Sequence, residues 1–273
     1  MQSDNHSTLV IDIGNSNIVI ALHQSGTWSN TFTYETRSIQ PDFYYESALR
    51  SILLEWNKQP SDINHCVISS VVPDMNDIIV NAVHHVTGVF PLLINPEVLK
   101  NLDMYVPLPY EIGSDLVANA YAAIHQYHDK CIIVDFGTAL TFTAVDKAQG
   151  ILGVTIAPGI KTALYSLFTK TAQLPIVPLE VPETILGHDT VSAIQAGVLC
   201  GYVGLIKEIV SRIKATLSDD YKVIATGGLS SVLQPLDGLF DYKNRMLTLE
   251  GIRLIYLFIS STTTSQCLPI TTF

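Results

Sequence analysis

Two aspartates, Asp12 and Asp135, stand in matching settings in the two halves of the chain. Each follows an apolar run rich in β-branched residues, and each precedes a glycine with a hydroxyl or amide residue close behind. The surrounding stretches, 8–22 and 130–146, predict a strand, a tight turn and a second strand in both places. A single Asp-x-Gly is common by chance, but its recurrence in the same setting favours an internal duplication over coincidence.

These turns have the composition of a phosphate site. Glycine lets successive N–H groups approach an anion, and a carboxylate at a strand end can hold Mg²⁺ through water. Phosphoryl transfer needs little more than such a cradle, a metal, an aligned hydroxyl and a base. Alternatively, each aspartate only caps its own turn through a side-chain hydrogen bond. The candidate phosphate residues are Asp12, Ile13, Gly14, Asn15, Ser16, Gly137 and Thr138. A third glycine turn, formed by Thr226, Gly227 and Gly228 after the strand that begins at Val223, makes the capping alternative less favoured.

Asp115 opens a predicted amphipathic helix that runs to Tyr127. A carboxylate at this position is an ordinary helix cap, and it is also a candidate base for a reacting hydroxyl. The residue types alone leave both interpretations open.

Composition limits the function classes. The 273 residues are 48% hydrophobic and 15% charged, which predicts a large buried core. A net charge of −10 argues against a nucleic-acid surface. The polar start of the chain and the short apolar runs predict a cytoplasmic protein that does not enter a membrane. The four cysteines are scattered, as expected of reduced structural thiols rather than disulfides or zinc ligands.

Strands and helices alternate along the chain, which indicates an α/β fold. Helices are predicted around 43–56, 114–127 and 190–213, and buried strands at 66–72 and 223–226. We expect two domains, 1–114 with the first phosphate turn and 115–273 with the second phosphate turn and the third glycine turn.

Seven motifs follow one another in the order seen in type III pantothenate kinases, and the chain resembles that family from about residue 9 to 257. The family implies two duplicated ribonuclease-H-like domains of the actin-like ATPase kind, with mixed five-stranded sheets and a cleft between them. It implies a homodimer that uses ATP to phosphorylate pantothenate to 4′-phosphopantothenate, the first step of coenzyme A biosynthesis. The motifs are DIGNS (12–16), GSD (113–115), DFGTALTF (135–142), APGI (157–160), TAQLP (171–175), GHDTVSAIQAG (187–197) and ATGGL (225–229).

The resemblance also implies a role for individual residues. Asp115 would be the general base, Asp12 would hold Mg²⁺ through water, and Asp135 would hold a monovalent cation such as K⁺ or NH₄⁺. Residues 226–228 would lie near the adenosine of ATP. Pantothenate would contact Tyr105, Gly113, Ser114, Asp115 and Thr190, the last of these from the partner subunit.

The sequence departs from the family pattern at two positions. The usual Gly-Ala-Asp-Arg reads Gly-Ser-Asp-Leu, so Leu116 replaces an arginine that would pair with the pantothenate carboxylate. Leu140 replaces a hydroxyl residue in the second turn. Lys161 or a tyrosine hydroxyl could compensate for the lost arginine. Because of Leu116, two alternatives stay open: a nucleotide-binding regulator without enzyme activity, and a kinase for another small hydroxylated acid or a sugar.

Overall fold

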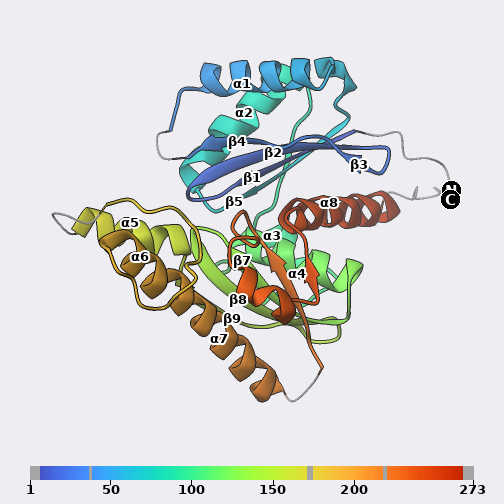
Figure 1. Cartoon of the computed structure of the whole chain (residues 1–273). Helices are drawn as coiled ribbons and strands as arrows, with labels where there is room; N and C mark the ends of the chain where they lie inside the picture. The colour runs from blue at the N-terminus through green and yellow to red at the C-terminus, as the bar shows by residue number, and fades with distance from the viewer. Residues whose placement is uncertain (1–6, 37–38, 171–174, 218–219, 267–273) are drawn as a thin grey trace, which may run out of the picture. The chain divides into compact units, whose positions relative to one another are not determined.

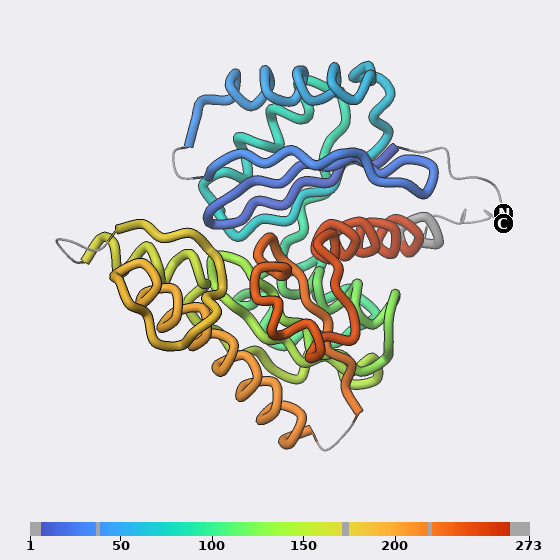
Figure 2. The backbone as a smooth tube through the Cα atoms, in the orientation of Figure 1, coloured from blue at the N-terminus to red at the C-terminus, as the bar shows by residue number. Residues whose placement is uncertain are grey.

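The computed structural model describes residues 7–36, 39–170, 175–217 and 220–266. The chain forms two compact units (Figures 1 and 2). The first unit contains Met1–Ala122 together with Thr248–Phe273, and the second contains Ala123–Leu247. The boundary expected at 114/115 was based on the phosphate turns and remains a prediction.

The first unit is built on a mixed sheet whose strand order is β3-β2-β1-β5-β6, with β4 as a sixth strand. β1 is antiparallel to β2 and parallel to β5. β3 and β4 pair with opposite ends of β2, so together they occupy the place of one interrupted strand. The strands are β1 (Thr8–Ile13), β2 (Asn17–Gln24), β3 (Thr27–Trp28), β4 (Phe32–Glu35), β5 (His65–Ser70) and β6 (Leu92–Leu93).

Two helices, α1 (Asp42–Glu55) and α2 (Asn76–Thr87), cover one face of this sheet (Figure 1). Alternate residues of β1, among them Ile11 and Ile13, join them in the core, so the residues between point to the other face. The remaining helical segments are η1 (Pro60–Asp62), η2 (Pro73–Met75), α3 (Pro96–Lys100), α4 (Ser114–Gln126) and α8 (Leu247–Gln266), of which residues 123–126 and 247 fall in the second unit.

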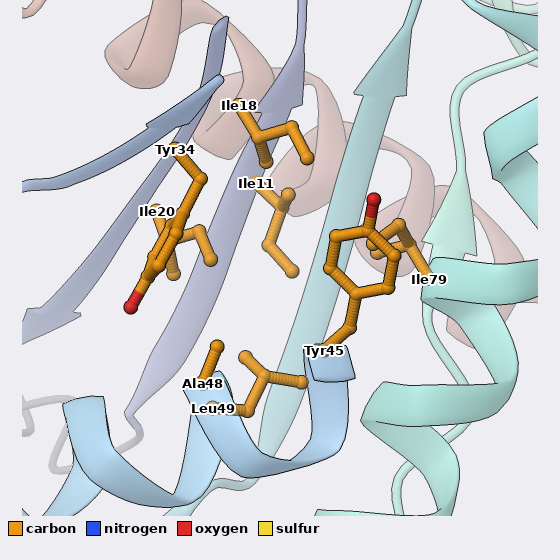
Figure 3. Close-up of a pocket in the computed structure, with 8 residues that line it drawn as sticks. All are labelled: Ile11, Ile18, Ile20, Tyr34, Tyr45, Ala48, Leu49 and Ile79. Atoms are coloured by element: carbon orange, nitrogen blue, oxygen red, sulfur yellow. The ribbon is translucent and has the colours of Figure 1, made fainter. Parts of the chain in front are cut away.

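A small cavity remains where α1 meets the sheet (Figure 3). Its volume is about 10 Å³ and its walls are apolar, so it could hold no more than one water molecule and is not a substrate site. The lining residues are Ile11, Ile18, Ile20, Tyr34, Tyr45, Ala48, Leu49 and Ile79.

The second unit repeats the topology of the first. Its strand order is β9-β8-β7-β10-β11, with β8 antiparallel to both β7 and β9, and β10 parallel to β7 and β11. When β3 and β4 are taken as one strand, both sheets have the same order and the same directions, which confirms the predicted duplication. The strands are β7 (Lys130–Phe136), β8 (Ala139–Asp146), β9 (Gly150–Pro158), β10 (Lys222–Thr226) and β11 (Tyr242–Lys243).

The helix predicted at 190–213 runs from Thr190 to Leu217 and contains a π-helical turn, η3. Judged by length and composition alone, this helix could cross a membrane. Leu199, Ile206 and Val210 are nevertheless buried in the core of the second sheet, as in a core helix of a globular unit. The helical segments of this unit are α5 (Ile160–Lys170), α6 (Thr190–Gln195), η3 (Ala196–Cys200), α7 (Gly201–Leu217) and η4 (Gln234–Leu239).

The other predicted elements are found within a few residues of their expected bounds. Four of the five residues of the TAQLP motif lie outside the described residues. Cys66, Cys131 and Cys200 are free thiols. Burial raises the pKa of Cys66 and raises that of Cys131 to about 12, so both are poor nucleophiles.

Candidate active site

Asp12 is the next-to-last residue of β1, and its side chain lies on the face of the first sheet opposite α1 and α2. The turn that follows is closed by a hydrogen bond of 2.9 Å from the Gly14 N–H to the Asn17 carbonyl. Asn15 is exposed at the tip of this turn. The predicted first phosphate loop is therefore a tight turn with an accessible tip at the end of a central strand.

Ser114 holds the neighbouring Asp115 at the end of the first sheet where Asp12 lies. The hydroxyls of Ser114 and Ser69 lie 2.9 Å apart in a buried pair, and Ser114 Oγ also donates to the Ser70 carbonyl at 3.2 Å. Ser69 is the direct neighbour of Asp12 in the register of β1 and β5, so their side chains share a face. The start of α4, which carries Asp115, is thus fastened to the strand beside Asp12.

The carboxyl group of Asp115 has an environment suited to a base. Its Oδ1 accepts a hydrogen bond of 2.8 Å from the Leu116 N–H. Burial raises the pKa of Asp115 above its usual range, and this outweighs the lowering effect of the backbone hydrogen bonds. A carboxylate with a raised pKa is a stronger proton acceptor, as general-base catalysis near neutral pH requires. Asp115 is the second residue of α4 rather than the residue that caps it, and its backbone hydrogen bonds are compatible with the predicted role as a base.

Asp135 holds the equivalent place in the second unit. Its partners in the sheet register are Thr141 on β8 and Thr226 on β10, and all three side chains share one face. The hydroxyl oxygens of both threonines are buried and have no hydrogen-bond partner among the described residues. Two unsatisfied oxygens beside a carboxylate form a donor set suited to a cation.

Gly227 lies directly against Asp135. Its φ angle is +87°, and a Cβ atom at this position would lie 2.5 Å from Asp135 Oδ1. Only glycine fits both the backbone angle and the space. The predicted third glycine turn is thus part of the surroundings of Asp135.

The second phosphate turn packs against the APGI motif. A Cβ atom on Gly159 would lie 2.4 Å from the carbonyl oxygens of both Gly137 and Thr138. The Gly159 N–H donates to the Thr138 carbonyl at 3.0 Å. The start of α5 is therefore held in contact with this turn, and Gly137 and Thr138 remain exposed.

The residues predicted to contact pantothenate are distributed over both units. Gly113 lies close to the Asp115 carboxyl group, and Ser114 is buried and engaged as described. The Tyr105 side chain is 68% exposed, and Leu116 is partly exposed. Thr190 is the exposed first residue of α6, a helix capped by Asp189, whose side chain accepts from the Ser192 N–H at 2.8 Å. The substrate roles of these residues remain predictions.

Sequence reasoning missed several residues that support the site. The hydroxyls of Thr36 and Thr162 donate to carbonyl groups of the two predicted phosphate loops. Ser69 pairs with Ser114, and Thr141 lies beside Asp135. Their positions follow from strand register and tertiary contact, for which no local sequence signal exists.

Comparison with known proteins identifies the family. The model of the type III pantothenate kinase family matches residues 8–212. The chain belongs to the type III pantothenate kinases. A type III pantothenate kinase of Geobacillus kaustophilus is 37% identical over 247 residues, which covers 90% of this chain and 96% of the relative. The type III pantothenate kinase of Geotalea uraniireducens is 35% identical over 248 residues, with 91% and 97% covered.

Solved structures confirm the fold of this family member. An activator of 2-hydroxyisocaproyl-CoA dehydratase from Clostridium difficile, solved with bound ADPNP, superposes with a TM-score of 0.56. It is 12% identical, and the match covers 98% of this chain and 100% of that one. A Campylobacter jejuni protein described as a Baf family transcriptional activator gives a TM-score of 0.57 at 20% identity, over 93% of this chain and 99% of that one.

Proposed function

We propose that this family member uses ATP to phosphorylate pantothenate to 4′-phosphopantothenate, the first step of coenzyme A biosynthesis. The observation that supports this function is the Ser69–Ser114 hydroxyl pair, which holds the half-buried Asp115 beside the strand that bears Asp12 and the first glycine turn. A base next to a phosphate cradle is the arrangement that a kinase needs and that a pure nucleotide-binding protein does not.

Each part of the site has a proposed role. Asp115 takes the proton of the acceptor hydroxyl. Asp12 holds Mg²⁺ through water, with residues 13–16 at the phosphates. Gly137 and Thr138 bind phosphate in the second unit, and residues 226–228 lie near the adenosine. Tyr105, Gly113, Ser114 and Thr190 contact pantothenate.

A coupled assay of ADP release on the purified protein tests the function. We expect turnover with pantothenate and ATP, and none with a pantothenate analogue in which hydrogen replaces the 4′-hydroxyl. Turnover with another hydroxy acid or a sugar, but not with pantothenate, would contradict the substrate. Nucleotide binding without turnover on any of these acceptors would favour a regulatory protein.

We also propose that Asp135 binds K⁺ or NH₄⁺, with the Thr141 and Thr226 hydroxyls as further ligands. The two buried and unsatisfied oxygens in register with Asp135 support this site. Among the described residues no group of three His, Cys, Asp or Glu side chains could hold a metal ion, so hydroxyl and carbonyl oxygens would complete the coordination. Binding of K⁺ should raise the unfolding temperature, and Asp135→Ala should remove this effect. Equal stabilisation of both proteins by K⁺ would contradict the site.

We propose a homodimer formed through the second unit. Large apolar side chains are exposed on β9, α5, α6 and the segment between these helices, around the predicted partner contact Thr190. Exposed apolar surface of this extent is typical of a subunit interface. Light scattering should give twice the chain mass, and Leu186→Glu should give monomers. The exposed residues are Ile156, Tyr165, Leu167, Phe168, Ile176, Ile185, Leu186 and Val191.

We further propose that the enzyme works in the cytoplasm, without nucleic-acid or membrane partners. The acidic net charge argues against a nucleic-acid surface, and the burial of Leu199, Ile206 and Val210 in the second core argues against a membrane span of the 190–217 helix.

A further inference from the structure

The first phosphate loop is held by Thr36, which comes directly after β4. The Thr36 N–H donates to the Ser16 carbonyl at 3.0 Å, and its Oγ1 donates to the Gly14 carbonyl at 2.8 Å. Thr36 is 7% exposed, so both bonds are shielded from water. One residue thus fixes two peptide groups of the loop.

The second phosphate loop is held in a similar way by the segment after β9. The Gly159 N–H donates to the Thr138 carbonyl at 3.0 Å, and Thr162 Oγ1 donates to the same oxygen at 2.7 Å. Unlike Thr36, Thr162 is exposed.

The two arrangements are equivalent in the duplicated topology. β4 pairs with β2 as β9 pairs with β8, so each holding segment leaves the third strand of its own sheet. In each unit one backbone N–H and one threonine hydroxyl bind carbonyl oxygens of the loop between the first two strands. The two threonines make the same kind of hydrogen bond from different positions: Thr36 directly follows β4, and Thr162 lies in the first turn of α5.

These bonds have a direct consequence for anion binding. A carbonyl oxygen that turned toward a phosphate would repel it, whereas an N–H would attract it. Because a trans peptide group is planar, fixing its oxygen also fixes the N–H of the next residue on the opposite side. We propose that Thr36 and Thr162 are positioning residues for nucleotide phosphates, which keep the Gly14 and Thr138 carbonyls turned away from them. This inference rests on the proposed ATP-dependent function.

Removal of each hydroxyl at constant shape tests the proposal. Thr36→Val should weaken ADP binding and raise KM for ATP about 10-fold, and Thr162→Val about 3-fold, because the exposed bond also has water as an alternative partner. KM for pantothenate should change less than about 2-fold. Thr36→Ser and Thr162→Ser, which keep the hydroxyl, should recover most of the ADP affinity.

Thr33→Val and Thr155→Val are matched controls, since both threonines are exposed on β4 and β9 themselves. Equal ADP affinity of the valine variants and the parent, or equal losses in the serine and valine variants, would overturn the positioning role. If Thr36→Val does not fold, the ADP affinities of Thr162→Val and Thr162→Ser decide whether the positioning role holds. A parent protein that binds no ADP would overturn the proposed function as well. ADP binding without turnover would overturn only the kinase activity.

Discussion

The pKa of Asp115 is raised although its carboxyl group accepts backbone hydrogen bonds. A raised pKa favours the proposed role as a base but lowers stability at neutral pH. The folded chain binds a proton at Asp115 at higher pH than the unfolded chain does, because burial disfavours the charged form. The stabilising effect of protonation is therefore present below the unfolded pKa and is lost as pH rises through the folded pKa. At neutral pH the carboxylate that we propose as the base is maintained at some cost in stability.

Asp115→Asn should reduce kcat about 10²- to 10⁴-fold, because an amide cannot accept the proton. The unfolding temperature at pH 7 should stay the same or rise, since the buried charge is removed. In the parent, kcat/KM should fall with decreasing pH at a pKa above the value of about 3.9 for an exposed aspartate. A parent-like kcat in a folded variant would exclude Asp115 as the base.

The surroundings of Leu116 determine whether the arginine typical of the family can be restored at this position. The Leu116 side chain is partly exposed in the first turn of α4, so an arginine can reach water there without a buried charge. Leu116→Arg should lower KM for pantothenate and leave kcat nearly unchanged, the sign of uniform binding. An analogue without the carboxylate should show no change, and Leu116→Gln should act like the parent. An unchanged KM in Leu116→Arg would mean that another group already pairs the carboxylate.

At the scale of elements, the contact between the APGI segment and the second loop depends on the missing side chain of Gly159. Gly159→Ala should lower the free energy of unfolding by about 1 to 3 kcal/mol, because its Cβ would overlap two carbonyl oxygens. ADP affinity should fall too. Gly153→Ala in β9 is the matched control, since its Cβ would meet nothing within 4 Å. Similar unfolding curves for the two variants, in urea titrations followed by circular dichroism, would contradict this packing.

The elements themselves were largely predictable, and their contacts were not. Apolar runs that end in Asp-x-Gly located β1 and β7 because strand propensity and turn chemistry are local. The Ser69–Ser114 pair joins residues 45 positions apart, and Thr141 meets Asp135 only through strand register. The π-helical turn at 196–200 was also not foreseen, because its backbone hydrogen bonds leave no distinct sequence pattern.

At the scale of the whole molecule, the C-terminal helix α8 belongs to the N-terminal unit. Glu250 on α8 accepts a hydrogen bond of 2.5 Å from Trp28 Nε1 and pairs with Arg253 at 3.3 Å. The side chains of Glu250 and Arg253 are 16% and 18% exposed. A largely buried acidic group therefore joins the helix to β3.

Glu250→Leu should lower the free energy of unfolding by about 2 kcal/mol or more, because it leaves the Arg253 charge without its partner. Both tryptophans, Trp28 and Trp56, lie in the first unit, so urea unfolding followed by their fluorescence reports this unit. Adding Arg253→Met should recover part of the loss. The exposed pair Arg212–Glu208 provides the control. Glu208→Leu should change the free energy of unfolding by less than about 1 kcal/mol, measured in urea titrations followed by circular dichroism. Equal effects of the two glutamate substitutions would contradict the role of burial.

The position of α8 also sets the order in which the chain can mature on the ribosome. The second unit is continuous in sequence from Ala123 to Leu247, so all of it has been synthesised before the rest of α8 is. Residues up to 122 leave the ribosome before the second unit does, yet their unit stays incomplete until α8 has been synthesised. Domains usually complete in the order of synthesis, N-terminal first. In this protein the unit synthesised second is the first able to complete its structure, while the unit whose synthesis begins earlier keeps the surface for α8 open until α8 has been synthesised.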